Sequence, residues 1–282
     1  MPTTTTAPAT RSGFGSTSRN DNWWVTPLLT FLGLSSFVVY STWAAFQAAD
    51  YFSHVNGADY LSPFYSPVLW DANDSITGKS LESGHALFGP QPPWWPGFLP
   101  FSPAFLILWA PAGFRMTCYY YRGAYYKAFW ADPPACAVGE PRKSYLGENS
   151  LPLIIQNIHR YFLYVAICFL FFLAYDAYLS MQFTKIVDGK DVTEFGIGLG
   201  SIVLSLNVFF LSGYTLGCHS LRHLIGGFMN HLSKSPVRSK CYSCVSCLNK
   251  RHMVWAWCSL FWVGFTDVYI RFLADSIDFR IL

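Results

Sequence analysis

The chain has 282 residues, of which 52% are hydrophobic and only 12% are charged. A soluble domain typically carries about 25% charged residues, so the composition excludes an ordinary soluble enzyme, a disordered protein and a coiled coil. The formal net charge of +3 is too small to support nucleic-acid binding. A polytopic integral membrane protein is the class that this composition indicates.

Residues 1–22 are rich in Thr, Ser, Ala and Gly. They lack an apolar segment behind a basic start, which a signal peptide requires, so we interpret them as a flexible tail. Trp23 and Trp24 follow, and Trp side chains prefer the interface between bilayer and water. The membrane domain is therefore expected to cover residues 23–282.

Five apolar segments of this domain are long enough to cross a hydrocarbon core of about 30 Å. The sequence thus predicts an all-α fold, a bundle of five transmembrane helices. The expected spans cover residues 25–49, 98–121, 159–183, 195–221 and 253–272. No internal repeat is apparent, so an inverted-repeat transporter receives no support.

Lys and Arg residues are distributed unevenly between the two sides of the predicted bundle. With the N-terminus inside, the inner segments hold 14 of the 19 Lys and Arg residues. Cytoplasmic loops are enriched in these residues, so we expect a cytoplasmic N-terminus and an outer C-terminus. Most His and Cys residues then lie near the cytoplasmic face.

His219 and His223 lie four residues apart at the inner end of the fourth predicted span. This spacing places both imidazoles on one helix face, where two histidines can bind one metal ion. A polar helix end, with Arg222 reaching to lipid headgroups, explains the pair equally well. The sequence leaves both interpretations open.

Cys118 and Cys136 flank a basic and aromatic stretch that ends in two prolines. A rigid proline loop can return Cys136 to the helix end that carries Cys118. Nearby Arg and Lys side chains would favour the thiolate form, which a metal ligand needs. The alternative is two buried free cysteines that behave as small hydrophobic residues.

His159 begins the third predicted span. A histidine at a helix end can bind haem, an iron–sulfur cluster or a quinone, although an interfacial hydrogen-bonding role is the simpler interpretation. Cys241, Cys244 and Cys247 resemble half of a metal motif, but no second Cys-x-x-Cys accompanies them. We interpret these three cysteines as structural.

Two acidic residues fall within predicted spans. Asp176 and Asp267 are each costly inside a bilayer and are functional candidates for that reason. Arg271 follows Asp267 by four residues, on the same helix face. We therefore expect Asp267 to form an ion pair with Arg271.

Three segments resemble a known family. They cover residues 118–138, 157–162 and 217–227, and a short segment at 249–253 accompanies them. Together they resemble the membrane-anchor subunit of the actinobacterial class of succinate dehydrogenase, respiratory complex II. The resemblance covers approximately residues 22–282 and leaves the N-terminal tail outside.

The resemblance implies a complex of the plasma membrane that serves electron transport and the tricarboxylic acid cycle. A flavoprotein subunit with covalent FAD would oxidise succinate, and an iron–sulfur subunit would pass electrons to this anchor. Membrane lipids and a higher oligomer of the complex are also implied. The quinone, expected to be menaquinone, would accept the electrons.

This class also resembles enzymes that carry a Rieske-type [2Fe–2S] cluster in the anchor and lack haem. Such a cluster takes two Cys on one iron and two His on the other. We expect Cys118 and Cys136 on one iron and His219 and His223 on the other, with His159 as the rival histidine. Cys218 is adjacent to His219 and so points about 100° away around the helix, which makes Cys218 a poorer member of the same cluster.

The quinone headgroup is expected at the cytoplasmic side of the bilayer, close to the last redox centre. Aromatic and basic residues would line its site and supply hydrogen bonds to the carbonyl oxygens. The candidates are Tyr119, Tyr120, Arg122, Trp130 and His252. An interfacial belt, or a basic docking surface for the iron–sulfur subunit, explains the same residues.

Two other functions remain open from the sequence. One is an anchor with haem b, held by His159 together with His219 or His223. The other is a membrane scaffold or transporter without redox chemistry.

Overall fold

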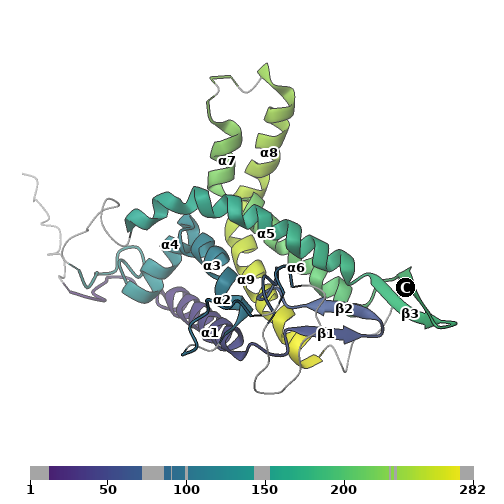
Figure 1. The fold of residues 1–282 in the computed structure, drawn as a ribbon. Helices are drawn as coiled ribbons and strands as arrows, with labels where there is room; N and C mark the ends of the chain where they lie inside the picture. The colour runs from purple at the N-terminus through teal and green to yellow at the C-terminus, as the bar shows by residue number, and fades with distance from the viewer. Residues whose placement is uncertain are drawn as a thin grey trace, which may run out of the picture.

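The structure is a computed structural model that describes residues 13–71, 86–89, 91–98, 101–142, 153–228, 230–231 and 234–273. Four helices are long and apolar enough to cross a membrane, and they pack side by side (Figure 1). They are α1 (Val25–Gln47), α5 (His159–Leu179), α6 (Leu199–Leu216) and α9 (His252–Val268). They correspond to four of the five predicted spans and confirm a helical membrane bundle.

The second predicted span, 98–121, is not one continuous helix. It divides into α2 (Pro103–Ile107) and α3 (Trp109–Met116), and α4 (Tyr119–Tyr125) follows. Pro111 has no N–H to donate to the carbonyl group of Ile107, which interrupts the helical hydrogen bonds between α2 and α3. Five unbroken spans are therefore not observed in the described residues.

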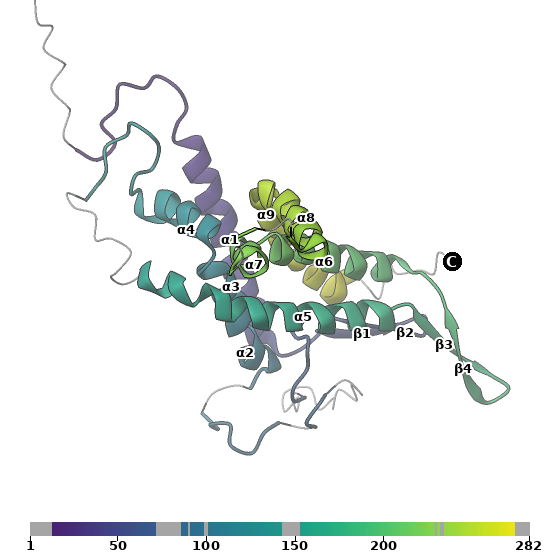
Figure 2. The same cartoon turned by 90° about the horizontal axis from the view of Figure 1, so that it is seen from above.

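Two antiparallel hairpins accompany the helices. They are β1 (Phe52–Val55) with β2 (Ala58–Leu61), and β3 (Gln182–Val187) with β4 (Lys190–Phe195). Figure 2 shows β3 and β4 beyond the C-terminal end of α5, opposite the end where α4 lies. Both hairpins are small additions to the helical bundle that the sequence analysis did not predict.

The turn between β3 and β4 has a recognisable sequence. Asp188 and Gly189 both adopt positive φ, at 51° and 75°, as the two-residue turns of tight hairpins require. The hairpin occupies the segment where the third predicted span was expected to end and the fourth to begin. The helices therefore stop at Leu179 and start again at Leu199, inside the boundaries that the sequence suggested.

A buried ion pair stabilises the end of the bundle where the hairpins lie. Arg271 Nε lies 2.7 Å from Asp267 Oδ2, and the two side chains are 1% and 0% exposed. Tyr40 of α1 donates to the same carboxylate at 2.6 Å, and Arg271 also donates to the carbonyl oxygen of Ala49 at 2.6 Å. The predicted pairing is confirmed, and it joins α9 to α1.

Asp176 lies in the same end of the molecule, near the end of α5. Its carboxylate accepts a hydrogen bond from Ser66, and its side chain is buried. The contact connects α5 to the segment that follows β2.

At the other end, α7 (His219–Gly226) and α8 (Pro236–Lys250) form a helical pair that leaves the bundle (Figure 1, top). The fourth predicted span therefore ends at Leu216 rather than at residue 221. Cys241, Cys244 and Cys247 are all exposed on α8.

Residues 13–22, within the expected N-terminal tail, pair with the loop that carries Cys136. Gly15 N–H donates to the Gly139 carbonyl group at 3.0 Å, and Gly139 N–H donates to the Ser16 carbonyl group at 2.8 Å. Arg19 donates to the carbonyl oxygen of Cys136 at 2.8 Å. The expected tail thus includes a segment with defined hydrogen-bond partners, whereas residues 1–12 lie outside the described residues.

Candidate functional site

Two buried cysteines stand at helix breaks at one end of the bundle. Cys118 separates α3 from α4, and Cys218 separates α6 from α7; both have extended backbones, with ψ of 131° and 141°. Their side chains are buried, because the residues are 2% and 1% exposed. The break at Cys218 invalidates the helical-wheel argument against it, since His219 begins a new helix.

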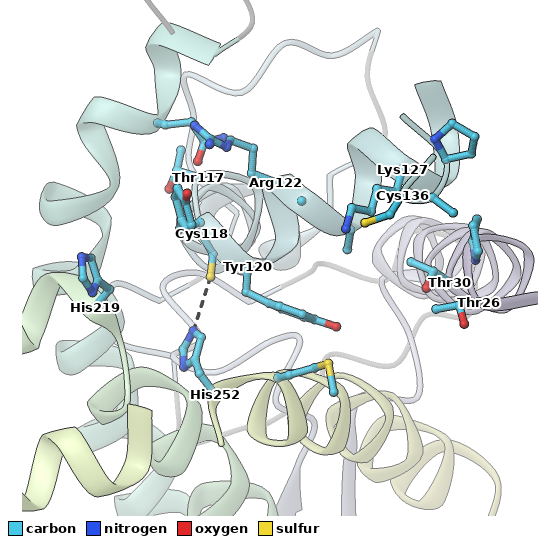
Figure 3. Close-up of a pocket in the computed structure, with 18 of the residues that line it drawn as sticks. Thr26, Thr30, Thr117, Cys118, Tyr120, Arg122, Lys127, Cys136, His219 and His252 are labelled. Atoms are coloured by element: carbon cyan, nitrogen blue, oxygen red, sulfur yellow. Dashed lines mark hydrogen bonds between the residues drawn. The ribbon is translucent and has the colours of Figure 1, made fainter. Parts of the chain in front are cut away.

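Each cysteine faces a histidine that begins a membrane helix. His252 Nε2 at the start of α9 lies 3.4 Å from Cys118 Sγ (Figure 3). His159 Nε2 at the start of α5 lies 3.0 Å from Cys218 Sγ. The fold thus forms two contacts between a thiol and an imidazole, with the four residues coming from four separate chain segments.

The surroundings of the two histidines repeat the same contacts. Phe114 stacks on His159 with centroids 4.7 Å apart and planes 7° apart. Tyr214 stacks on His252 with centroids 5.0 Å apart and planes 18° apart. Phe114 and Tyr214 also meet edge to face at 5.4 Å, so the two stacks support each other.

Two glycines make corresponding close contacts beside these aromatic stacks. A Cβ atom on Gly113 would lie 2.3 Å from the ring of Phe162, and one on Gly213 would lie 2.4 Å from the ring of Trp255. Phe162 and Trp255 each follow a histidine of the site by three residues. Only glycine allows α3 to approach α5, and α6 to approach α9, this closely at these points.

A short internal repeat underlies this arrangement. Residues 113–122 and 213–222 share the pattern Gly-(Phe/Tyr)-x-x-x-Cys-x-x-x-Arg, with an offset of one hundred residues. The sequence analysis did not detect this repeat, because only four of its ten positions are identical or similar. The contacts in the structure make the correspondence recognisable. The repeat is what could have drawn attention to Cys218.

The sequence-predicted metal ligands are only partly brought together. Cys118 and His159 belong to the buried cluster of thiols and imidazoles. Cys136 is exposed and lies across the pocket from Cys118, beside Lys127 (Figure 3). His219 and His223 pair with each other, their Nε2 atoms being 2.9 Å apart.

The electrostatics of these groups follow from burial. Desolvation raises the pKa of the Cys218 thiol to about 11, although the N–H group of Ser220 donates to its sulfur at 3.3 Å. Desolvation and the neighbouring His223 lower the pKa of His219. Among the described residues, no three His, Cys, Asp or Glu side chains are grouped closely enough to bind a single metal ion.

A cavity of about 1150 Å³ opens beside the cysteines and histidines. Four of the five predicted quinone residues line it: Tyr119, Tyr120, Arg122 and His252. Trp130 is not part of the lining; it packs edge to face on Tyr126 at 4.7 Å. The cavity is large enough for a cofactor-sized ligand, since such sites usually measure about 300–1,000 Å³.

Sequence reasoning missed several residues of this cavity. Arg19, Asp21, Trp23 and Gln156 also line it. Arg19 lowers the pKa of Asp21, chiefly through their direct hydrogen bonds. The composition of the N-terminal segment gives no sign that Arg19 and Asp21 reach the cavity, because they are brought there by the pairing of this segment with the loop that carries Cys136.

Apolar helices long enough to cross a membrane, with paired thiols and imidazoles at one end, define a polytopic membrane protein. The chain belongs to the family of actinobacterial succinate dehydrogenase subunit SdhC, whose family model matches residues 25–276. It is also similar to a chain of the Mycobacterium smegmatis Sdh1 complex in the apo form, with 42% identity and a TM-score of 0.78. That similarity covers 93% of this chain and 96% of the other chain.

No curated protein matches the chain significantly. The family match confirms the resemblance seen in the sequence, and it identifies a membrane-anchor subunit that is part of a succinate dehydrogenase complex. Its partners are other subunits of that complex.

Proposed function

We propose that this anchor passes electrons from an iron–sulfur partner subunit to quinone through a Rieske-type [2Fe–2S] cluster. The ligands in this proposal are Cys118, Cys218, His159 and His252. The single observation that carries it is a pair of matching contacts, in each of which a buried thiol meets an imidazole: Cys118 with His252, and Cys218 with His159. Two thiolates and two imidazoles are the donor set of a Rieske cluster, which supplies one-electron chemistry when bound.

The helix terminus at Cys218 offsets part of the cost that burial imposes on a thiolate. Cys218 stands at the N-terminus of α7, and the Ser220 N–H group donates to its sulfur. Helix N-termini and N–H groups stabilise negative sulfur. Such hydrogen bonds also influence the reduction potential of an iron–sulfur cluster.

This ligand set revises the one expected from sequence. Cys136 is exposed and its carbonyl group is held by Arg19, while His219 and His223 face each other. Cys218 is buried whereas Cys136 is exposed, and His252 is less exposed than His219 and His223, which favours Cys218 and His252 in their place. His159 changes from a rival to a full member of the set.

Quinone reduction consumes two electrons and two protons. We propose that the headgroup occupies the 1150 Å³ cavity, whose lining includes Tyr119, Tyr120, Arg122 and His252. Tyr120 is held in place because Trp257 donates to its hydroxyl oxygen at 2.6 Å. Aromatic rings would enclose the headgroup, and the polar groups of Tyr120 and Arg122 would orient its carbonyl oxygens.

The remaining features of the proposal follow from the family and from charge. Electrons would originate from succinate at a subunit with covalent FAD and arrive through an iron–sulfur subunit. The N-terminus would lie in the cytoplasm and the C-terminus outside, in the plasma membrane, since most Lys and Arg residues fall in segments on the same side as the N-terminus.

Spectroscopy of the purified complex tests this function. Pulsed electron paramagnetic resonance should detect a reduced [2Fe–2S] centre that couples to imidazole nitrogen. The coupling of one of the two imidazole nitrogens should disappear in His252→Ala, whereas both couplings should persist in His223→Ala. A reducible haem band would instead support the haem b alternative, and a complex with neither signal would support a scaffold without redox chemistry.

A further inference from the structure

The hydroxyl group of Thr117 makes two hydrogen bonds at the end of α3. Its Oγ1 atom lies 2.7 Å from the carbonyl oxygen of Gly113 and 2.8 Å from Nδ1 of His159. Thr117 is 2% exposed and His159 is 8% exposed, so water hardly competes for these bonds.

The directions of both bonds follow from counting protons. A hydroxyl group has one proton, and a carbonyl oxygen can only accept. The proton of Thr117 is therefore donated to Gly113. Oγ1 must accept the other bond, so the proton of that bond belongs to Nδ1 of His159.

This assignment fixes the tautomer of His159. A neutral imidazole carries a single ring proton, so a protonated Nδ1 leaves a lone pair on Nε2. Nε2 is the atom that faces Cys218 at 3.0 Å. Histidines that bind metals almost always donate their second ring N–H to an oxygen, which orients the ring and makes it a stronger ligand.

The second half of the repeat lacks a corresponding hydrogen bond to histidine Nδ1. The position that corresponds to Thr117 is Gly217, which has no side chain. Nδ1 of His252 is buried and has no hydrogen-bond partner among the described residues. The two histidines share the aromatic stack and the cysteine contact but differ in this one bond.

We propose that Thr117 is a positioning residue that holds His159 with Nε2 directed at the metal and raises its strength as a ligand. This inference rests on the proposed function, in which His159 binds the cluster. A stronger imidazole donor stabilises oxidised iron, so Thr117 lowers the reduction potential. His252 receives no such support, so the two imidazoles are inequivalent.

Three substitutions in the whole complex test this role. Thr117→Val keeps the shape of the side chain but removes the acceptor, so it should shift the midpoint potential upward and change the nitrogen coupling of one histidine. Loss of an oxygen partner of this kind typically costs about 10- to 100-fold in metal affinity or activity. Thr117→Ser retains the hydroxyl group and should restore the wild-type potential and spectrum.

Thr215→Val is the matched control, because Thr215 is similarly buried, at 3% exposure. Within the part of the chain that the structure describes, no hydrogen bond joins its hydroxyl group to His159 or His252. The substitution should therefore leave the potential unchanged. If Thr117→Val does not assemble, Thr117→Ala removes the hydroxyl group without adding bulk and is compared with Thr117→Ser in the same way.

The outcomes separate this inference from the proposed function. If the wild type shows the cluster and the variants without the hydroxyl group keep its potential and nitrogen coupling, the role of Thr117 is overturned and the cluster stands. If the wild-type complex has no centre coupled to nitrogen, the proposed function fails and this inference fails with it. A positive shift that Ser reverses supports both.

Discussion

The Nε2 atom of His159 lies 3.0 Å from the Sγ atom of Cys218, although 59 residues separate them in the chain. The contact depends on a helix that stops. Because α6 ends at Leu216 and α7 begins at His219, Cys218 can turn toward α5 instead of following the helical rotation. Cys118 uses the same kind of break to reach His252.

Replacing Cys218 with Ser should remove the cluster signal and reduce quinone reduction to less than about a tenth, since a ligand is lost. Oxidation of succinate by a soluble dye at the partner flavoprotein should continue. Cys136→Ser is the control and should keep both activities, because Cys136 is exposed. The reverse pattern would restore the ligand set expected from sequence.

The three cysteines of α8 should not hold iron. Cys241, Cys244 and Cys247 are exposed on a helix that leaves the bundle, where water can reach any bound group. A triple Ser variant should retain the iron and acid-labile sulfide content of the wild-type complex. Loss of about two irons per complex would contradict this prediction.

Gly213→Ala should destabilise the anchor, because the new Cβ would lie 2.4 Å from the ring of Trp255. Overpacking of this kind costs about 1–3 kcal/mol, which a lower melting temperature of the purified complex would reveal. Gly123→Ala is the control, since a methyl group at that position would meet no atom within 4 Å beyond its chain neighbours and the backbone of its own helix. Equal melting temperatures for the two variants would show that the helices can separate at no cost.

Arg271→Ala should reduce the yield and stability of the complex strongly. It would leave the carboxylate of Asp267 buried without its ion-pair partner, and breaking one partner of a buried pair typically costs about 3–5 kcal/mol. Lys185→Ala removes the exposed pair with Glu194 and should have little effect. A normal melting temperature for Arg271→Ala would show that other groups neutralise Asp267.

Arg122→Ala should raise the Michaelis constant for quinone, because Arg122 lines the cavity. Trp130→Ala should instead lower the yield, since Trp130 packs on Tyr126 outside the cavity lining. Steady-state kinetics with a soluble quinone, measured beside the content of assembled complex, distinguishes the two effects. An unchanged Michaelis constant for Arg122→Ala would show that quinone binds at another site.

The membrane class, the four long helices and the family could all be predicted from the amino-acid sequence. These follow from local properties: apolar length determines which segments can cross a bilayer, and the family resemblance depends on short contiguous motifs. The ion pair between Asp267 and Arg271 was also predictable, because a spacing of four residues on a helix sets it.

Which cysteine and histidine side chains contact one another depends instead on how the helices pack. His219 and His223 have the spacing of a metal pair, yet they contact each other on α7, whereas His159 and His252 meet the cysteines from helices far apart in the chain. Helical spacing predicts neighbours only within a continuous helix. The breaks at Cys118 and Cys218 place the site between helices, where the packing of α3, α5, α6 and α9 selects the side chains that face one another.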